Sequence, residues 1–379
     1  MAYSKQAISV CWEGPQQSSH SMANVNRAIE TELLLDPRVN LTIIPRETPF
    51  PVDPGINIGP LVPHFKAVVR SEVQLHVRHA WPPNLSTPAT GHIVLMQPWE
   101  YGWLPDAFVK AINKDFDEVW VPSTYVRDVY IASSVDPTRI HVIPNGVDTG
   151  LFKPRICEDC DSQRKAFTFL FVGGLLYRKG IDCLLRAYLR SFSRNDEVLL
   201  IVKEVPQYGM NRYRSIIEAS QLNSESPRIK LISADLPESQ MVELFNSCDC
   251  LLHPYRGEGF ALPVLEAMSC GLPAIVTSGG ATDDFVDETC GFLVPAVKRF
   301  FGKREIMGLP CTGDLWLMEP DVAQLGKIML SVFLNRTNTK RLGVMARLRV
   351  EDKWTWKETA KLVVTRMQAI VKKKVVRFS

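Results

Sequence analysis

Apolar runs of strand length alternate with helical patterns through the second half of the chain. FTFLFVG at 167–173, VLLIV at 198–202 and CLLHPY at 250–255 are strand-like, whereas IDCLLRAYLRSF at 181–192 repeats apolar residues at helical spacing. This alternation is typical of successive βαβ units. It predicts an open parallel sheet with helices on both faces.

The first half shows the same alternation in a weaker form. A strand at 7–12 (AISVCW) precedes a helix near 21–35, and strand-like runs recur as far as RIHVIP at 139–144. These patterns predict a second doubly wound sheet. The fold class is therefore α/β, with two Rossmann-like domains.

The junction between the two predicted domains lies in IPNGVDTGLFKP at 143–154. Its Asn145 and Gly146 favour a turn, and prolines bound the stretch. The 379 residues suffice for two domains of ordinary size. We expect an amino-terminal domain, a second domain and a closing amphipathic helix, at 1–150, 151–350 and 351–379.

A short helix is predicted at 263–270, inside the stretch EGFALPVLEAMSCG. Pro263 is favoured at a first helical position because its missing N–H would be unpaired there. Gly271 and Pro273 supply the stop. Backbone amides near Ala261, Leu262 and Val264 point out of the start of this helix. The helix dipole adds partial positive charge there, which favours a phosphate.

Two glutamates flank the start of that helix. Glu258 lies in the preceding loop and Glu266 about one turn inside the helix, so the pair is placed to hydrogen-bond hydroxyls beside a bound diphosphate. Two acids around an anion site indicate a sugar nucleotide. In the alternative interpretation, Glu266 only favours the helix start and Glu258 is a solvated loop charge.

Two basic residues, Arg178 and Lys179, follow the predicted strand at 167–173. Ligands of such sheets bind beyond the carboxyl ends of the strands, so this pair and Glu258 are expected at the same edge. Lys179 supplies a compact positive charge, and Arg178 supplies a planar guanidinium with paired N–H donors. Both are suited to a diphosphate. A basic pair before a helix is also typical of a solvated face.

These segments resemble the donor-binding domain of retaining glycosyltransferases of the GT-B fold, family-four type (glycosyl transferases group 1). The matching pieces are FVGGLLYRKGIDCLLRAY, LFNSCDCLLHPYRGEGFALPVLEAMSCGLPAIVTSGG and GFLV, at 171–188, 244–280 and 291–294. The resemblance implies two Rossmann-like domains that face a cleft. It also implies that the terminal helix crosses back to the first domain.

The resemblance implies roles for individual residues. Glu258 would face the transferred sugar near its anomeric centre, Glu266 would hold the ribose hydroxyls, and Lys179 would hold the diphosphate. Backbone amides between the two acids would contact sugar and phosphates: Gly259, Phe260, Ala261 and Leu262. The chain departs from the family at Gly174, where a phosphate-holding arginine is common, and Arg178 either replaces that arginine or does not.

The predicted first domain offers two loops for an acceptor or for the donor sugar. Small residues in the loop 13–21 allow a ligand to approach closely, and His20 is its ionisable group. Alternatively, His20 caps or packs against the next helix. In QPWEYGWLP at 97–105, which lacks the family histidine, Trp99 and Glu100 combine a ring face with a carboxylate, as sugar sites do. A packing loop between domains is the alternative.

Composition narrows the classes of function. A formal net charge of +3 without a dense basic block argues against nucleic acid as a partner. No run approaches 18 apolar residues and no apolar signal core follows Met1, so we expect a soluble, cytoplasmic protein; the basic tail VKKKVVRF is a weak membrane candidate. The cysteines are scattered as in a reduced protein, and the lone pair Cys157 and Cys160 lacks zinc spacing.

The resemblance implies a retaining glycosyltransferase, expected to be a hexosyltransferase. It would move a sugar from a UDP-, GDP- or ADP-sugar to an acceptor hydroxyl and give an α-linked product. The leaving diphosphate, stabilised by Lys179, Arg178 and the helix start, would assist deprotonation of the acceptor. The nucleotide sugar is a co-substrate, and no cofactor or metal is expected, because no Asp-x-Asp stands at a strand end.

Two other functions are alternatives. A catalytically inert GT-B protein that binds a nucleotide or glycan as an adaptor is favoured by Gly174. An NAD-dependent enzyme lacks support because no GxGxxG with a following acid succeeds a strand. The sequence separates neither the three donor nucleotides nor glycan, lipid, protein and small-molecule acceptors.

Overall fold

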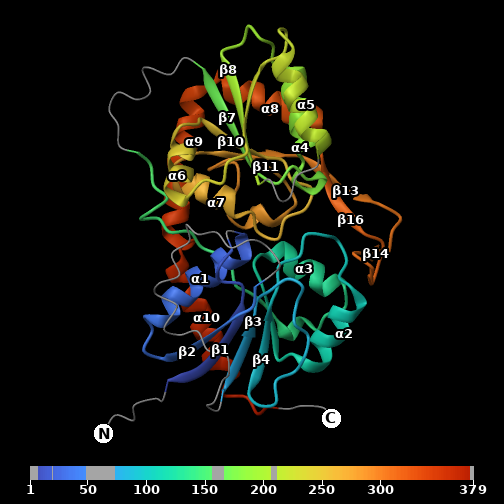
Figure 1. The fold of residues 1–379 in the computed structure, drawn as a ribbon, viewed down its shortest axis with the longest axis vertical. Helices are drawn as coiled ribbons and strands as arrows, with labels where there is room; N and C mark the ends of the chain where they lie inside the picture. Colours follow the sequence, from blue (N-terminus) through green and yellow to red (C-terminus); the bar gives the residue numbers. More distant parts are fainter. Residues whose placement is uncertain (1–6, 19, 48–72, 156–165, 206–210, 376–379) are drawn as a thin grey trace. The chain divides into compact units, whose positions relative to one another are not determined.

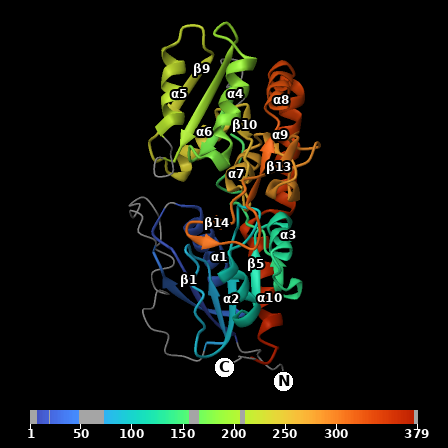
Figure 2. The ribbon, with the colours of Figure 1, turned by 90° about the vertical axis from the view of Figure 1, so that its right-hand side faces the viewer.

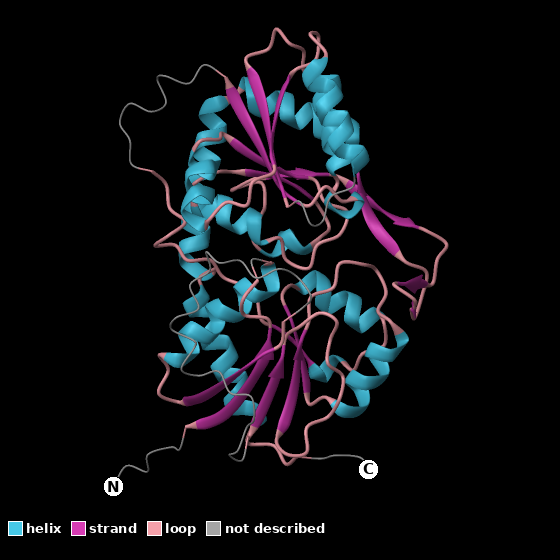
Figure 3. Cartoon of the chain, viewed as in Figure 1, coloured by secondary structure: helices cyan, strands magenta, loops and turns pink. Residues whose placement is uncertain are grey.

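The computed structural model describes residues 7–18, 20–47, 73–155, 166–205 and 211–375. The described chain forms two compact α/β units, each built around a six-stranded sheet (Figures 1 and 3). Unit 1 consists of Met1–Gly146, Gly302–Leu315 and Trp356–Ser379, and unit 2 of Val147–Phe301 and Trp316–Thr355.

The sheet of unit 1 is parallel, with strand order β2-β1-β3-β4-β5-β6. Its strands are β1 (Ile8–Gly14), β2 (Val39–Pro45), β3 (Leu75–Arg78), β4 (His92–Met96), β5 (Glu118–Val121) and β6 (Ile140–Val142). Its helices are α1 (Ser21–Leu34), α2 (Asp106–Asp115), α3 (Thr124–Ala132) and α10 (Trp356–Ile370). All five residues of β4 are buried, as is typical of a strand covered on both faces.

The last helix, α10, packs against α1 and completes the core of unit 1. Val363, Val364, Met367 and Ile370 are fully buried along one side of α10. On another side, Arg366 forms an ion pair with Glu118, a buried residue at the start of β5. The final helix of the chain is therefore an integral element of the unit that contains the first residues.

The sheet of unit 2 is also parallel, with strand order β12-β11-β10-β7-β8-β9. Its strands are β7 (Phe167–Gly173), β8 (Val198–Glu204), β9 (Arg228–Ile232), β10 (Cys250–His253), β11 (Ala274–Thr277) and β12 (Phe292–Val294). Its helices are α4 (Ile181–Ser191), α5 (Asn211–Leu222), α6 (Glu238–Asn246), α7 (Leu262–Ser269), α8 (Val322–Leu334) and α9 (Arg336–Lys353). The prediction of two doubly wound parallel sheets is confirmed.

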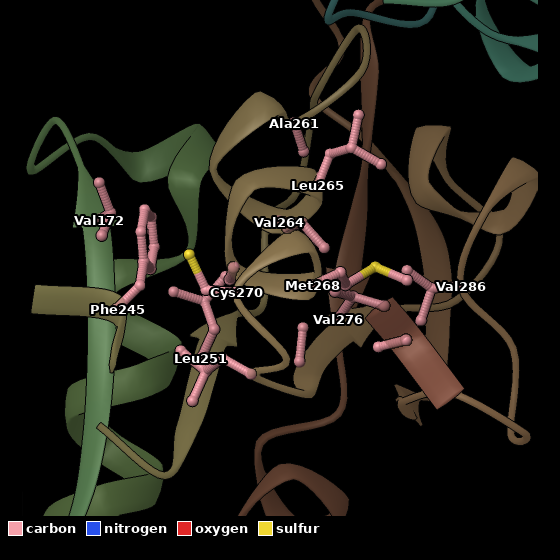
Figure 4. Close-up of a cluster of buried hydrophobic side chains, with 14 of the residues drawn as sticks. Val172, Phe245, Leu251, Ala261, Val264, Leu265, Met268, Cys270, Val276 and Val286 are labelled. Carbon is pink, nitrogen blue, oxygen red and sulfur yellow. The ribbon is translucent and has the colours of Figure 1, made fainter. Parts of the chain in front are cut away.

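Two apolar clusters hold the helices of unit 2 to its sheet. The cluster drawn in Figure 4 joins α6, α7 and α9 to one face and includes Phe245, Leu251 and Met268. The other joins α4, α5 and α8 to the opposite face and includes Leu184 and Met329. Helices α8 and α9 also lie against each other (Figure 2). Burial on both faces explains why the central strands are continuous apolar runs.

A two-stranded sheet between β12 and α8 has no counterpart in the sequence prediction. Its antiparallel strands are β13 (Ala296–Phe300) and β16 (Trp316–Pro320) (Figure 1). The segment between them, 302–315, belongs to unit 1 and contains the short strands β14 (Glu305–Ile306) and β15 (Leu309–Pro310).

The 302–315 segment is attached to unit 1 by backbone contacts. Thr312 N donates to Leu104 O at 3.0 Å, and Cys311 forms a β-bridge with Pro105. Gly313 lies under the ring of Trp103, where a Cβ would come within 2.6 Å of a ring atom. Across the described part of the chain, no helix is both long and apolar enough to cross a membrane.

Candidate active site

Two loops of unit 2 meet where β7 and β10 end. Arg178 lies in the 3₁₀ turn η3 (Tyr177–Lys179) after β7, and its carbonyl accepts a hydrogen bond from the Arg256 amide at 2.7 Å. The approach requires Gly180, which has a φ of +71°, because a Cβ there would lie 1.8 Å from the carbonyl oxygen of Pro254. These contacts hold the two loops with the predicted donor residues side by side.

Glu258 is the point at which the charged side chains of these loops meet. The residue is 5% exposed. Its Oε1 accepts a hydrogen bond from Lys179 Nζ and lies 3.0 Å from Nε2 of His253. Its Oε2 lies 3.7 Å from Nη1 of Arg178. The structure therefore brings Glu258, Lys179 and Arg178 together.

The electrostatic environment keeps Glu258 charged. Burial by itself would raise the pKa of Glu258, but the charge of Lys179 and the hydrogen bond from His253 hold that pKa well below its ordinary value. Glu258 is therefore a carboxylate at neutral pH and only accepts hydrogen bonds. Burial lowers the pKa of His253, which favours a neutral ring that donates from Nε2 to Glu258.

A fully buried arginine fixes the loop that carries Glu258. Arg256 donates to both carboxylate oxygens of Asp182 at 2.6 and 2.8 Å, and to both of Glu319 at 2.7 and 2.8 Å. Its guanidinium carbon lies 3.7 Å from the centre of the Tyr177 ring. Asp182 belongs to α4 and Glu319 to β16, so one side chain joins three elements. Removing it would leave two partly buried carboxylates without their main partner.

The second glutamate of the motif has a different environment. Glu266 lies on α7, is half-buried, and forms no side-chain hydrogen bond within the described ranges. Burial and the nearby charge of Glu238 raise the pKa of Glu266 to about 7. Two carboxylates of one motif thus differ in charge near neutral pH.

The segment between the two glutamates forms the predicted start of a helix. Gly259, Phe260 and Ala261 connect Glu258 to α7, and Ala261 has a φ of +74°, in the left-handed region that favours glycine. Such backbone strain tends to cluster at functional sites. The Phe260 ring packs on Phe285 at 5.1 Å between centroids and belongs to the apolar core of unit 2. Leu262, the remaining predicted contact, is the first residue of α7.

Gly174 follows β7 directly, and its carbonyl accepts the amide of Leu176 at 2.8 Å. The cation nearest in sequence is Arg178, which donates to the Gly257 carbonyl at 3.2 Å and faces Glu258. Arg178 therefore lies four residues after Gly174 and contacts the loop that carries Glu258.

The candidate residues of unit 1 are His20, in the loop before α1, and Trp99 and Glu100, in the loop after β4. His20 is the residue before α1, but its side chain does not cap the helix, and burial with the charge of Arg27 lowers the pKa of His20. Trp99 is buried against Trp81 and Phe108 and donates from Nε1 to the Trp103 carbonyl, so its ring packs inside unit 1. Glu100 is half-buried, and its charge contributes to the raised pKa of Tyr125.

A buried polar group supports the loop after β1. Glu30 of α1 is completely buried and accepts a hydrogen bond from Gln16 Nε2 at 2.9 Å. Arg27 donates to the carbonyls of Gln16 at 2.8 Å and Ser18 at 2.9 Å. Burial raises the pKa of Glu30 to about 8, although the bond from Gln16 opposes the shift.

Sequence reasoning missed two residues of the unit 2 site. His253 is a polar residue at the end of an apolar strand, immediately before the glutamate motif, and that position was its available signal. Arg256 is a cation between a buried strand and the same motif. The pairing of Arg256 is not visible in the sequence, because its carboxylate partners lie more than 60 residues away.

Comparison with known proteins agrees with this architecture. Residues 166–303 match the family described as "Glycosyl transferases group 1". Residues 60–151 match the family described as "Glycosyltransferase Family 4". Sucrose-phosphate synthase from Thermosynechococcus elongatus superposes with a TM-score of 0.71 and 17% identity, covering 96% of this chain and 99% of that one. Anabaena HepE in complex with UDP-glucose gives 0.69 and 14%, covering 96% and 100%.

Curated relatives are similar in sequence over part of their length. The MMP alpha-(1->4)-mannosyltransferase of Mycolicibacterium hassiacum is 25% identical over 70% of this chain and 56% of its own length. A GDP-mannose-dependent phosphatidylinositol monomannoside mannosyltransferase of Corynebacterium glutamicum is 28% identical over 68% of this chain and 64% of its own length. The chain thus spans less than two thirds of these relatives.

Two Rossmann-like units with parallel six-stranded sheets define the GT-B class of folds. Within that class, the chain belongs to the group 1 glycosyltransferases of family 4.

Proposed function

We propose that this protein is a retaining glycosyltransferase that moves a hexose from a nucleotide sugar to an acceptor hydroxyl and forms an α-linked product. The observation that carries the proposal is the buried Glu258 carboxylate, bonded to Lys179 and His253 at the carboxyl edge of the unit 2 sheet. Ligands of open parallel sheets bind at that edge. The two mannosyltransferase relatives support an α-linked product and make GDP-mannose one of the first donors to test.

The proposed roles follow from charge and hydrogen-bonding capacity. Lys179 and Arg178 neutralise the diphosphate, assisted by the backbone at the start of α7. A carboxylate at Glu258 accepts hydrogen bonds from hydroxyls of the transferred sugar, and Glu266 accepts those of the ribose. Because these cations supply the charge stabilisation, the reaction is proposed to need no metal; an unchanged rate in EDTA is the expected result.

The proposed transfer occurs on one face of the sugar. The acceptor oxygen bonds to the anomeric carbon as the bond from that carbon to the diphosphate oxygen breaks. The acceptor proton passes to an oxygen of the leaving diphosphate. Lys179 holds the charge that develops on this leaving group, so its contribution is largest in the transition state.

A donor screen tests the proposal. The purified chain is assayed for binding and slow hydrolysis of UDP-, GDP- and ADP-sugars, with Glu258→Gln and Lys179→Ala as site variants. The exposed residues Glu218 and Lys327 provide matched controls, Glu218→Gln and Lys327→Ala. We expect turnover of one donor, a loss of about a hundredfold or more in both site variants, and no change in the controls.

Two outcomes would contradict the proposal. Tight binding of a nucleotide without turnover, with any acceptor offered, would favour an inert adaptor, as the glycine at position 174 does. No binding of any sugar nucleotide would overturn the donor site itself.

A further inference from the structure

The strand β13 exposes apolar side chains on both of its faces. Val297 is 69% exposed, Phe300 is 59% exposed, and the next residue, Phe301, is 36% exposed. Side chains three residues apart on a strand point to opposite faces, so Val297 and Phe300 are exposed on different sides. Within the described residues, β13 pairs with β16 alone.

Cations accompany these apolar side chains. Lys298 and Arg299 are exposed, and the chain continues with exposed Lys303 and Arg304. Residues 296–304, AVKRFFGKR, contain no acid. Arg299 is 3.6 Å from Glu319 and remains largely exposed, so that ion pair is in contact with water and neutralises little at long range.

The arrangement disfavours two of the usual partners for an exposed strand. Lysine and arginine on an edge strand oppose the addition of another β-strand, because their charged side chains would have to lie beside that strand. A protein seated on one face of β13 would cover either Val297 or Phe300 and leave the other in water. A lipid headgroup region that the strand enters covers both.

We propose that β13, with Val297 and Phe300 as its apolar contacts and Lys298 and Arg299 as its charges, binds a membrane surface that contains anionic phospholipids. The apolar side chains enter the boundary between headgroups and acyl chains, where aromatic rings are favoured. The cations Lys298 and Arg299 are attracted by the negative surface potential. The contact is peripheral and does not depend on the proposed catalytic activity.

Vesicle flotation with the full chain tests the proposal. Phosphatidylcholine vesicles are compared with vesicles in which about one lipid in three is phosphatidylglycerol. We expect binding to the anionic vesicles, weakened by salt, and a drop of about tenfold in Val297→Ser/Phe300→Ser. The matched control is Leu222→Ser/Leu334→Ser, which removes two apolar side chains of unit 2 that are 89% and 77% exposed.

The controls decide between this inference and its rivals. Equal losses in both double variants, or no binding to anionic vesicles, would overturn it. Retention by single-stranded RNA with no retention by vesicles would assign the cations to nucleic acid instead. A native chain that is dimeric by light scattering and becomes monomeric in Val297→Ser/Phe300→Ser would assign the strand to self-association. Circular dichroism of both variants confirms that folding is retained.

Discussion

Two buried carboxyl groups, Glu258 of unit 2 and Glu30 of unit 1, have pKa values that are shifted in opposite directions. Glu258 is buried, but Lys179 lies against it, so its pKa is low. Glu30 is equally buried, but its hydrogen-bonding partner is a neutral amide, and the pKa of Glu30 rises to about 8. Burial disfavours charge in both cases; the direct contact with Lys179 outweighs it at Glu258, whereas the charge of Arg27 does not outweigh it at Glu30.

Glu30 makes the stability of unit 1 depend on pH. Its folded pKa of about 8 lies above the unfolded value near 4.5, so between these pH values the unfolded chain releases a proton that the folded chain keeps. Stability contributed by this group is therefore present below about pH 4.5 and falls as pH rises toward 8, at most by roughly 1.4 kcal/mol per pH unit. We expect the free energy of unfolding of Glu30→Gln to decrease less between about pH 5 and about pH 8 than that of the native chain. Urea unfolding at about pH 5, 6.5 and 8 measures this difference.

Glu266 contributes in a similar window, since its pKa is about 7. Glu266→Gln is therefore a useful comparison, because its effect should level off about one pH unit lower than that of Glu30→Gln. Parallel pH curves for the native chain and Glu30→Gln would show that Glu30 is ionised in the folded state.

Short connections between elements, more than long helices, determine the geometry of the unit 2 site. The turn η3 and the start of α4 touch the end of β10 through Gly180, and Arg256 ties β16 to the same place. The connection from Glu258 to α7 passes through the strained Ala261. Gly180 allows a backbone approach that a side chain would prevent, Arg256 acts through its guanidinium, and Ala261 holds a strained backbone.

Replacing Gly180 with alanine should separate these connections. A Cβ at position 180 would lie 1.8 Å from the Pro254 carbonyl oxygen, so η3 must move and carry Lys179 away from Glu258. We expect donor binding by calorimetry to weaken about tenfold or more. Gly308→Ala is the control, because Gly308 has a similar φ of +77° and no heavy atom within 4 Å of the added Cβ. An equal effect in both variants would mean that backbone strain, not the collision, is responsible.

The elements that the sequence predicts well are those with apolar periodicity. β7 occupies the predicted range 167–173, and α7 begins within one residue of the predicted 263. β13 was missed because charged and aromatic side chains share an exposed strand, which gives no periodic pattern. The His253 contact was missed because the chain turns sharply between residues 253 and 258, which residue spacing does not reveal. The contact between Lys179 and Glu258 could be predicted because both residues follow strands of one parallel sheet, whose carboxyl ends lie at one edge.

Across the whole chain, the two units are assembled differently from their segments. Unit 2 uses two segments, 147–301 and 316–355, whereas unit 1 uses three. Its third segment supplies α10, whose buried side chains face α1, and the Arg366 partner of the buried Glu118. A continuous stretch of the first half therefore does not contain the complete core of unit 1.

Ending the chain at Thr355 should unfold unit 1 selectively. The loss of Val363, Val364, Met367 and Ile370 removes roughly 1.5–3 kcal/mol per side chain, which together is comparable to the stability of a whole domain. We expect hydrogen exchange measured by mass spectrometry to lose protection in β1–β6 and keep it in β7–β12. A chain ending at Val375 retains α10 and should match the full chain. Retained protection of β1–β6 in the shorter chain would show that α10 is dispensable.

The three-segment construction of unit 1 also sets an order for biosynthesis. A ribosome completes every residue of unit 2 when it adds Thr355, but at that moment unit 1 still lacks its last helix. The unit encoded second is thus the first whose full sequence is available to fold, while the strands made first must wait for the closing helix. During that interval, the face of unit 1 that α10 later covers is open to chaperones and to other nascent chains.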